Sequence, residues 1–285
     1  MEKIIPLVTV TMSAYNHEKY VEEAIEGIVN QTYGLKNIEL IVIDDCSVDN
    51  TPYILESLSK KHGFSFIKND VNKGLCFNKN RAISMAKGKY LAGCASDDIW
   101  EPEKLALQVA YMERNEACGV TFGKVTLIDN NGKIIIEKNE KQYRQRITLE
   151  NFFRRQCYVP APTLMFHTDL IKKTGGYRED IHVEDLYMLM KFAQFSEIHF
   201  IDEFLAKYRR HEGTIQNNRV KMVNSLKKIY AEYKDTPLFR KYKYFLNVFY
   251  AVKLLPTHKI LATKYFLSGM PGLWQYYNIK HKRKS

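Results

Sequence analysis

Residues 40–45, LIVIDD, combine a run of apolar side chains with a pair of carboxylates at its end. A short β-branched apolar run predicts a buried strand. Parallel strands of an α/β sheet bind ligands outside their carboxyl ends. A second run, residues 90–98, YLAGCASDD, also ends in an acidic pair. Paired carboxylates are costly without a positive partner, so we expect these strand ends to meet a phosphate-bearing metal ion or the donor groups of a nucleotide base.

The composition suits one large α/β domain, alone or with an appendage, because the chain has 285 residues and is 45% hydrophobic. The net charge of +11 predicts an anionic partner: a phosphate ester, a membrane surface or a nucleic acid. No nucleic-acid motif accompanies this charge, so we expect no nucleic-acid partner. The five cysteines show neither CxxC spacing nor pairing with histidine, which argues against zinc and predicts reduced thiols.

The N-terminal residues lack a signal-peptide pattern, and no apolar run has the length of a membrane span. We therefore expect a cytoplasmic protein.

Strand and helix patterns alternate along the first hundred residues. Short apolar runs are separated by segments whose apolar residues recur at helical spacing. This alternation predicts an α/β fold with a Rossmann-like, doubly wound and mostly parallel central sheet flanked by helices. The expected strands are 7–12, 38–43, 64–67 and 90–95, and the expected helices are 19–31, 53–61 and 77–86.

The second half of the chain is less regular. It begins with a helix that ends near residue 115, and residues 129–132, DNNG, are a strong hairpin signal. From residue 217 long helical patterns rich in Lys, Tyr and Phe replace the mixed pattern. We therefore expect a catalytic domain at 1–215 and a helical, basic and aromatic extension at 216–285. Between the hairpin and the extension we expect irregular structure at 150–180 and a helix at 181–195, with strands at 119–128 and 198–208.

Five motifs in order resemble the inverting family 2 glycosyltransferases, which have the GT-A fold. The resemblance extends over about residues 7–212. The motifs are VTVTMSAYNHEKYVEEAIEGIVNQTY at 8–33, IELIVIDDCSVDNT at 38–51, NKGLCFNKNRAISMAKGKYLAGCASDDIW at 72–100, HVEDLYMLMKFA at 182–193 and YRRHEGTIQ at 208–216. Three positions depart from the family pattern: Ser13 replaces a common proline, Cys46 a common glycine, and Ala95 a frequent acid.

The resemblance implies that the loop after the first strand contacts the nucleotide of a nucleotide-sugar donor. The loop residues concerned are Ala14, Tyr15, Asn16 and Glu18, with Glu18 near the ribose. The alternative is an ordinary connecting loop.

The acidic pair Asp44 and Asp45 matches the family's diacidic turn, which reads the uracil and the ribose. A carboxylate only accepts hydrogen bonds, so it suits an N–H or hydroxyl donor. The alternative is that Asp45 caps the following turn. We expect one acid to bind the ligand and the other to hold the turn, with Asp45 as the better base contact.

Three further residues, Lys73, Asn80 and Arg81, lie in the donor-contacting part of the third motif. An arginine suits oxyanions because its guanidinium donates two parallel hydrogen bonds. Arg81 is therefore read either as a pyrophosphate contact or as an organiser of the acids, and a solvated surface charge is the third interpretation.

The acidic pair Asp97 and Asp98 matches the family's metal-binding D-x-D region, and His211 follows as a third metal or diphosphate contact. The resemblance implies Mn²⁺ or Mg²⁺, which take few carboxylates together with phosphates and water. Asp98 is the stronger ligand candidate, and Asp97 also faces the donor. The alternative is a helix N-cap ahead of residues 100–102.

The pair Glu184 and Asp185 matches the family's acidic helix, which implies Asp185 as the catalytic base and Glu184 as its orienting or acceptor-binding partner. A carboxylate within hydrogen-bond reach can take the proton of an acceptor hydroxyl. The alternative is a solvated helix start, where acids are common. The nearby Gly175 and Gly176 allow two interpretations that are compatible with each other: they admit acceptor backbone contacts, or they end the preceding helix.

These interpretations predict a metal-dependent, inverting glycosyltransferase of the hexosyltransferase type. It would transfer a sugar from a nucleotide-diphospho-sugar, UDP-linked, to a hydroxyl of a glycan or lipid-linked glycan in bacterial surface polysaccharide synthesis. The alternatives are a non-catalytic nucleotide- or glycan-binding protein and a sugar nucleotidyltransferase, although SAYNHEKY at 13–20 is no glycine-rich phosphate loop.

The basic, aromatic extension suits peripheral contact with an anionic membrane. Packing on the domain and dimerisation are its alternatives, and the oligomeric state stays open.

Overall fold

The computed structural model describes residues 5–135, 143–210 and 219–274, together with Tyr277 and Ile279. The chain forms two compact units. The first is made of residues 1–147, 158–179 and 188–212, and the second of 148–157, 180–187 and 213–285. The division expected after residue 215 falls among residues outside the described part. Two earlier segments of the chain also join the second unit.

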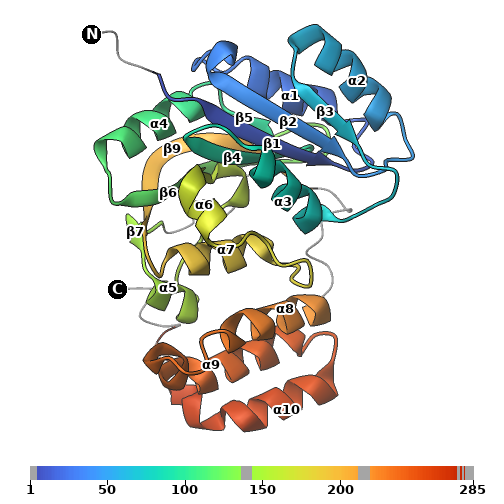
Figure 1. Ribbon diagram of the computed structural model, residues 1–285. Coiled ribbons are helices and arrows are strands. Elements are labelled where there is room, and N and C mark those ends of the chain that lie inside the picture. The colour runs from blue at the N-terminus through green and yellow to red at the C-terminus, as the bar shows by residue number, and fades with distance from the viewer. Residues whose placement is uncertain (1–4, 136–142, 211–218, 275–276, 278, 280–285) are drawn as a thin grey trace. The chain divides into compact units, whose positions relative to one another are not determined.

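The first unit is built on one mixed sheet (Figure 1). Its described strands follow the order β3-β2-β1-β4-β8-β6-β9-β5, and β7 pairs with β9. Strands β1 to β4 are parallel to one another, as the alternating pattern predicts. The strands are β1 (Val8–Ala14), β2 (Ile38–Asp44), β3 (Ser65–Lys68), β4 (Tyr90–Ala95), β5 (Ile99–Trp100), β6 (Cys118–Ile128), β7 (Arg146–Ile147), β8 (Met165–His167) and β9 (Glu197–Arg209).

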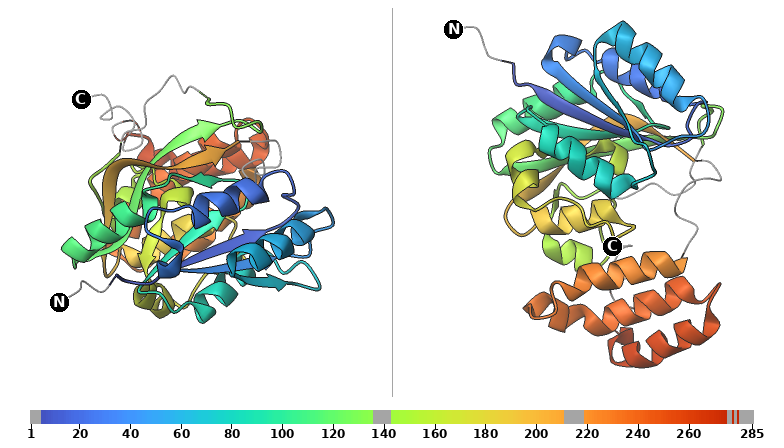
Figure 2. Two further views of the ribbon diagram at one scale, coloured as in Figure 1. Left: turned by 90° about the horizontal axis from the view of Figure 1, so that it is seen from above. Right: turned by 45° about the vertical axis from the view of Figure 1, so that its right-hand side comes forward.

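Helices cover both faces of the parallel strands (Figures 1 and 2). Side chains alternate between the two faces of a strand, so Leu40 and Val42 join the larger hydrophobic core, while Ile41 and Ile43 pack with Ala82 in a smaller one. The first unit contains α1 (Val21–Val29), α2 (Thr51–His62), α3 (Leu75–Met85), α4 (Lys104–Arg114), α6 (Thr168–Lys173) and most of α7 (Glu184–Phe192).

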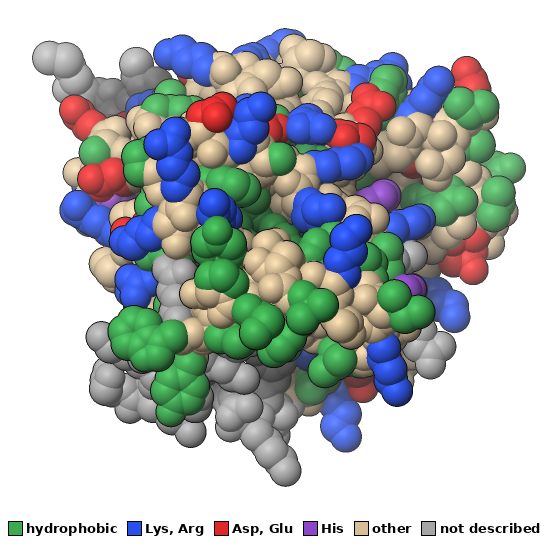
Figure 3. All heavy atoms as spheres, turned by 90° about the horizontal axis from the view of Figure 1, so that it is seen from below, with side chains coloured by type: hydrophobic (Ala, Val, Ile, Leu, Met, Phe, Trp, Pro, Cys, Tyr) green, Lys and Arg blue, Asp and Glu red, His purple; other side chains and the backbone are tan. Residues whose placement is uncertain are grey.

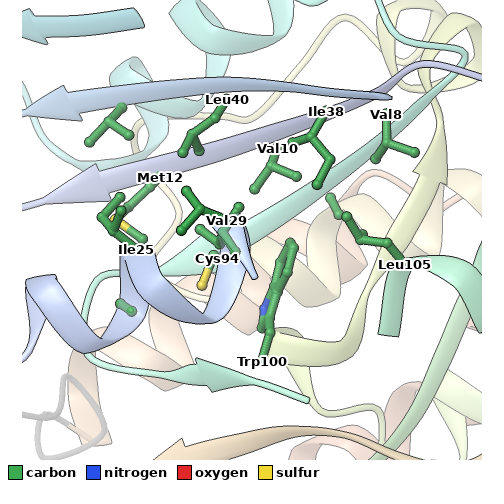
Figure 4. Packing of buried hydrophobic residues seen from close by; sticks show 14 of the residues in the cluster. Val8, Val10, Met12, Ile25, Val29, Ile38, Leu40, Cys94, Trp100 and Leu105 are labelled. Atoms are coloured by element: carbon green, nitrogen blue, oxygen red, sulfur yellow. The ribbon is translucent and has the colours of Figure 1, made fainter. Parts of the chain in front are cut away.

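The larger core fixes the parallel strands against α1 and α4. Val10 and Met12 of β1, Ile25 of α1, Trp100 of β5 and Leu105 of α4 are all at most 2% exposed (Figure 4). Close packing of this kind leaves little freedom at the strands, and the loops at their ends are therefore carried on a rigid base.

The segment 150–180, expected to be irregular, contains a short strand. Strand β8 inserts between β4 and β6 and is antiparallel to both. The prediction was wrong here because three residues are too few to show an alternating pattern. The strand is defined by its pairing with two neighbours. Leu91 of β4 lies opposite Phe166, and Thr121 of β6 lies opposite Met165.

The second unit is helical, as the Lys-, Tyr- and Phe-rich pattern predicts. Thr236 caps α9, accepting a hydrogen bond from the main-chain N–H of Phe239 at 3.2 Å, and Pro237 occupies the first helical position. Phe153 packs against the ring of Tyr230, with 5.0 Å between the centroids. The helices are α5 (Leu149–Phe153), α8 (Arg219–Ala231), α9 (Pro237–Leu254) and α10 (Lys259–Gly269), followed by the 3₁₀ turn Met270–Gly272.

Within the described residues, no helix combines the length and the apolar character that crossing a bilayer requires.

Candidate active site

The two acidic pairs lie at one edge of the sheet. Strand β1 is the common neighbour of β2 and β4, with Ala14 opposite Asp44 and Ser13 opposite Ala95. The main-chain N–H of Asp45 donates to the carbonyl of Ala14 at 2.8 Å. Because all three strands are parallel, their carboxyl ends place both acidic pairs at the same edge of the sheet, with the end of β1 between them.

The loop after β1 is tied to the loop after β2. Asn16, whose φ is +54°, donates its main-chain N–H to Ser47 Oγ and accepts from the N–H of Val48, both at 2.9 Å. Glu18 Oε2 accepts from the main chain and the side chain of Asn50, both at 2.9 Å. Asn16 and Glu18 thus shape the loop, whereas the ring of Tyr15 is exposed. Their contacts to a nucleotide stay predictions.

Asp44 and Asp45 are both buried and both hydrogen-bonded within the protein. Asp44 accepts from the main-chain N–H of Ser47 at 3.1 Å and from the Ser47 hydroxyl. Asp44, rather than Asp45, therefore holds the following turn.

Asp45 binds the turn that opens α3. Its Oδ1 accepts from Asn69 Nδ2 at 3.0 Å and from the N–H of Lys73 at 2.8 Å, and its Oδ2 accepts from the N–H of Gly74 at 2.8 Å. Burial alone would raise the pKa of Asp45, but the hydrogen bonds from Lys73, Asn78, Asn69 and Gly74 outweigh it and lower the pKa. Asp45 is therefore held as a charged acceptor, and its contact with a base stays a prediction.

Arg81 organises this acidic turn through Asn69. Its exposed guanidinium donates from Nη1 to Asn69 Oδ1 at 2.9 Å, and Asn69 donates in turn to Asp45. Of the three interpretations of Arg81, this geometry matches the organiser. Lys73 reaches Asp45 through its main chain, and its Nζ lies 5.9 Å from the centroid of the Phe77 ring.

Asn80 is joined to the turn that precedes α7 in the chain. Its Nδ2 donates to the carbonyl of Tyr177 at 2.8 Å, and its Oδ1 accepts from the N–H of Tyr177 at 2.7 Å. Gly175 and Gly176 both have φ of +82° and follow α6, so the helix-ending interpretation is confirmed. Gly176 lies so close to Asn80 that an added Cβ would come within 2.5 Å of Oδ1.

Asp97 and Asp98 form a tight turn directly after β4. Asp98 is 2% exposed, and its main-chain N–H donates to the carbonyl of Ala95 at 3.3 Å. Burial, and then the negative charge of Asp97, raise the pKa of Asp98 well above its usual value. The helix N-cap alternative is wrong, because α4 begins at Lys104 with Glu103 in the capping position.

Arg209 holds this turn, and the sequence did not single it out. Its main-chain N–H donates to Asp98 Oδ1 at 2.9 Å, and its Nε donates to the carbonyl of Asp97 at 2.8 Å. The guanidinium also donates to Glu23 Oε2 at 2.7 Å and to the carbonyl of Asp129 at 3.1 Å. An arginine at the end of β9, within the YRRH stretch, was the available signal.

The carboxylates of Asp97 and Asp98 fit a divalent cation. Asp98 is a buried acid beside a second acid, an arrangement that a cation would relieve. In the described part of the chain, no three His, Cys, Asp or Glu side chains cluster as a metal site, and His211 lies outside it. Two carboxylates suit Mn²⁺ or Mg²⁺, which complete their coordination with phosphate oxygens and water.

Glu184 and Asp185 open α7 and belong to the second unit. Both are half-buried, and Asp185 Oδ1 accepts from the N–H of Leu186 at 2.7 Å. The N–H of His182, just before the helix, donates to Ser225 Oγ at 3.0 Å. Acids in a first helical turn are favoured by the helix dipole, so the geometry agrees with the helix-start alternative, and the catalytic role stays a prediction.

Curated relatives are similar along most of the chain. An uncharacterised glycosyltransferase of Methanocaldococcus jannaschii is 32% identical over 253 residues, which is 87% of this chain and 85% of the relative. The Escherichia coli UDP-Glc:alpha-D-GlcNAc-diphosphoundecaprenol beta-1,3-glucosyltransferase WfgD is 29% identical over 246 residues, 85% of this chain and 91% of the relative.

Solved structures share the fold at low identity. Staphylococcus aureus TarS 1–349 in complex with UDP-GlcNAc matches with a TM-score of 0.70 and 21% identity, over 96% of this chain and 79% of that chain. The mannosyltransferase PcManGT of Pyrobaculum calidifontis, in complex with GDP-Man and Mn²⁺, matches with a TM-score of 0.67 and 16% identity, over 94% and 76%.

The turns of both acidic pairs lie in the part of the chain that a family model also covers. The model described as glycosyl transferase family 2 matches residues 9–172, more than half of the sequence. Together with the 32% identical relative and the shared architecture, this match shows that the chain is a glycosyltransferase of family 2 with the GT-A fold.

Proposed function

We propose that this enzyme transfers a hexosyl group from a UDP-linked sugar to a hydroxyl of a lipid-linked glycan, with inversion at the anomeric carbon, in surface polysaccharide synthesis. The observation that carries the proposal is the edge of the sheet, where the turn of Asp44 and Asp45 follows β2 and the turn of Asp97 and Asp98 follows β4, the two parallel strands that flank β1. The turn of Asp44 and Asp45 is suited to the uridine, and the turn of Asp97 and Asp98 is suited to a cation on the diphosphate.

The relatives support this choice of substrates. The name of WfgD gives a UDP-glucose donor and an acceptor sugar on a lipid diphosphate. One structure of TarS contains UDP-GlcNAc and another contains UDP. GDP-Man in the PcManGT structure makes a guanosine donor the alternative to be tested.

The chemistry that we propose needs one base and one stabilised leaving group. Asp185 takes the proton of the acceptor hydroxyl. As the proton leaves, the hydroxyl oxygen of the acceptor bonds to the anomeric carbon, and the bond from that carbon to the diphosphate breaks. Glu184 orients the acceptor or the base. Asp97 and Asp98 would hold Mn²⁺ or Mg²⁺, which offsets negative charge on the leaving UDP. Arg209 keeps those two acids in place.

The test separates donor binding from transfer. Purified protein is mixed with Mn²⁺ and each of UDP-glucose, UDP-GlcNAc, UDP-galactose and GDP-mannose, and the melting temperature and the release of nucleotide diphosphate are measured. We expect a UDP-sugar to raise the melting temperature and to be consumed when a synthetic lipid-diphosphate sugar is added. Chelation with EDTA should stop transfer and Mn²⁺ should restore it, whereas full activity in chelator would remove the metal role.

One variant and its control test the role of Asp185 as the catalytic base. Asp185→Asn should keep the thermal shift but lower transfer by about 10²- to 10⁴-fold, because the general base is lost. Asp169→Asn is the matched control, since Asp169 also lies in a first helical turn, that of α6. Undiminished transfer by Asp185→Asn would refute the base assignment. Binding of a UDP-sugar without turnover by the wild type would favour the non-catalytic alternative.

A further inference from the structure

The outer side of α10 and of the turn that follows it carries large apolar side chains in solvent. Ile260 is 91% exposed, Leu267 60%, Met270 51% and Trp274 79%. We call these four residues, with Lys259 and Lys264 beside them, the α10 face. We propose that the α10 face docks on a lipid bilayer that contains anionic lipid.

The apolar residues of the α10 face come from the helix and from the turn that follows it. Ile260 and Leu267 are seven residues apart within α10, which places both on one side of the helix. Met270 lies in the 3₁₀ turn that follows α10, and Trp274 comes just after that turn. The opposite side of α10 is already used, because Ala262 and Gly269 are buried, and a Cβ on Gly269 would come within 2.8 Å of the main chain of Val248 in α9. The helix is therefore apolar on both sides, and one of them has no covering element among the described residues.

Nearly all the excess positive charge lies in the same part of the chain. Residues 236–285 contain ten Lys and Arg and no Asp or Glu. The first 235 residues contain 33 Lys and Arg against 32 Asp and Glu, so they are close to neutral. The space-filling view from below intermixes Lys and Arg with hydrophobic side chains and places Asp and Glu toward its edges (Figure 3).

The exposed apolar side chains and the excess of Lys and Arg together favour an anionic lipid surface as the partner. Exposed apolar side chains among lysines suit the surface of an anionic bilayer, where the apolar side chains enter the acyl boundary and the lysines meet lipid headgroups. A tryptophan such as Trp274 prefers this interface because its ring is amphipathic. A second copy of the chain is a poor partner, since isologous pairing would bring together two surfaces of the same positive sign.

The inference extends the proposed function, because an enzyme that glycosylates a lipid-linked acceptor must work at the membrane surface. It is nevertheless tested by binding alone. Full-length protein is sedimented with vesicles of phosphatidylcholine, or of phosphatidylcholine with 30% phosphatidylglycerol. We expect at least about tenfold tighter binding to the anionic vesicles, weakened by 0.5 M NaCl. Equal binding to both vesicle types, or to neither, would overturn the proposal.

Variants locate the contact. Ile260→Ser with Trp274→Ser should weaken binding to anionic vesicles at least about tenfold, while consumption of a UDP-sugar with a water-soluble acceptor stays at the wild-type rate. The matched control is Tyr53→Ser with Ile134→Ser, which removes two apolar side chains that are 72% and 61% exposed in the first unit. Equal loss in both double variants would refute the assignment to the α10 face.

Tryptophan fluorescence gives an independent measurement. The chain has two tryptophans, and Trp100 is buried at 2% exposure. Emission from Trp274 should shift to shorter wavelength on anionic vesicles and be quenched by brominated lipids. A concentration-dependent dimer by light scattering, abolished by the Ile260 and Trp274 changes and accompanied by no such quenching, would show that a second copy covers the face instead.

Discussion

The main-chain N–H of Arg209 donates to Oδ1 of Asp98 at 2.9 Å, so the end of β9 holds the buried acid that follows β4. The guanidinium of the same residue donates to the carbonyl of Asp97 and to Glu23 Oε2. With 2% of its side chain exposed, Arg209 brings its charge into the protein interior beside the proposed metal ligands. Its chemistry is that of a positioning residue, because it acts through the two acids.

Replacing Arg209 with lysine should therefore weaken the metal site. The main-chain hydrogen bond to Asp98 survives in Arg209→Lys, but the guanidinium bonds to Asp97, Asp129 and Glu23 are lost. Supporting residues around metal ligands typically contribute 10- to 100-fold to metal affinity. We expect the Mn²⁺ concentration for half-maximal transfer to rise by about that factor.

The matched control is Arg210→Lys, which changes the exposed neighbour in the same stretch. The hydrogen bond from the main-chain N–H of Arg210 to the carbonyl of Ile128 is unaffected by the substitution. An Arg209→Lys enzyme with unchanged Mn²⁺ dependence and a lowered melting temperature would reduce Arg209 to a purely structural residue.

Two adjacent glycines offer a paired test of the Asn80 contact. Gly175 and Gly176 share φ of +82°, so alanine is strained at both, by about 1 kcal/mol or more. At Gly176 the new Cβ would also meet Asn80 Oδ1 at 2.5 Å, whereas at Gly175 nothing lies within 4 Å.

The free energy of unfolding should therefore fall more in Gly176→Ala than in Gly175→Ala, as measured by chemical denaturation. The difference should shrink in the background of Asn80→Ala, because the clash partner is gone. Equal losses at the two positions would contradict the close approach between Gly176 and Asn80.

The strands that carry the acidic pairs could be predicted because their signals are local. Apolar runs such as 40–43 are bounded by turn residues, and the helices between them show their own spacing. Strand β8 and Arg209 could not be predicted in this way. Each depends on partners far along the chain: β8 on β4 and β6, and Arg209 on residues 97 and 98, more than a hundred positions away.

The same reason explains why the separate roles of Asp44 and Asp45 could not be predicted. Both residues could be selected from the order of the motifs. Asp44 accepts hydrogen bonds from its own turn and Asp45 from the turn at 73–74, and these bonds exist only in the folded chain.

Asp45→Asn tests whether the charged acceptor stabilises the turn that opens α3. The amide replaces one of two oxygens that accept main-chain N–H groups, so a buried donor loses its partner, at a cost of about 1–3 kcal/mol. Because the pKa of Asp45 is lowered in the folded protein, its contribution is present above the unfolded pKa and is lost as pH falls through the folded pKa.

The difference in unfolding free energy between wild type and Asp45→Asn should thus be largest near neutral pH and shrink below about pH 4. Asp70→Asn, on an exposed acid close by, is the control, and near neutral pH the difference for Asp45→Asn should exceed the difference for this control. A difference that grows on acidification would contradict the lowered pKa.

Lys104 makes the unfolding free energy of the protein depend on pH in the alkaline range. The side chain is fully buried, donates to Gln108 Oε1, and places its Nζ 4.4 Å from the centroid of the Trp100 ring. Burial lowers the pKa of Lys104 to about 7. Between pH 7 and the unfolded pKa near 10.5, the unfolded chain binds a proton that the folded chain does not, so stability rises with pH.

Relative to Lys104→Met, the wild type should therefore gain up to about 1.4 kcal/mol of unfolding free energy per pH unit between pH 7.5 and 9.5. Urea denaturation at several pH values measures this slope. Lys60→Met, which removes the amino group of a side chain that is 76% exposed, is the control. A slope for Lys104→Met no larger than that of the control would mean that Lys104 keeps its proton in the folded protein, with the ring of Trp100 and the amide of Gln108 offsetting the cost of burying the charge.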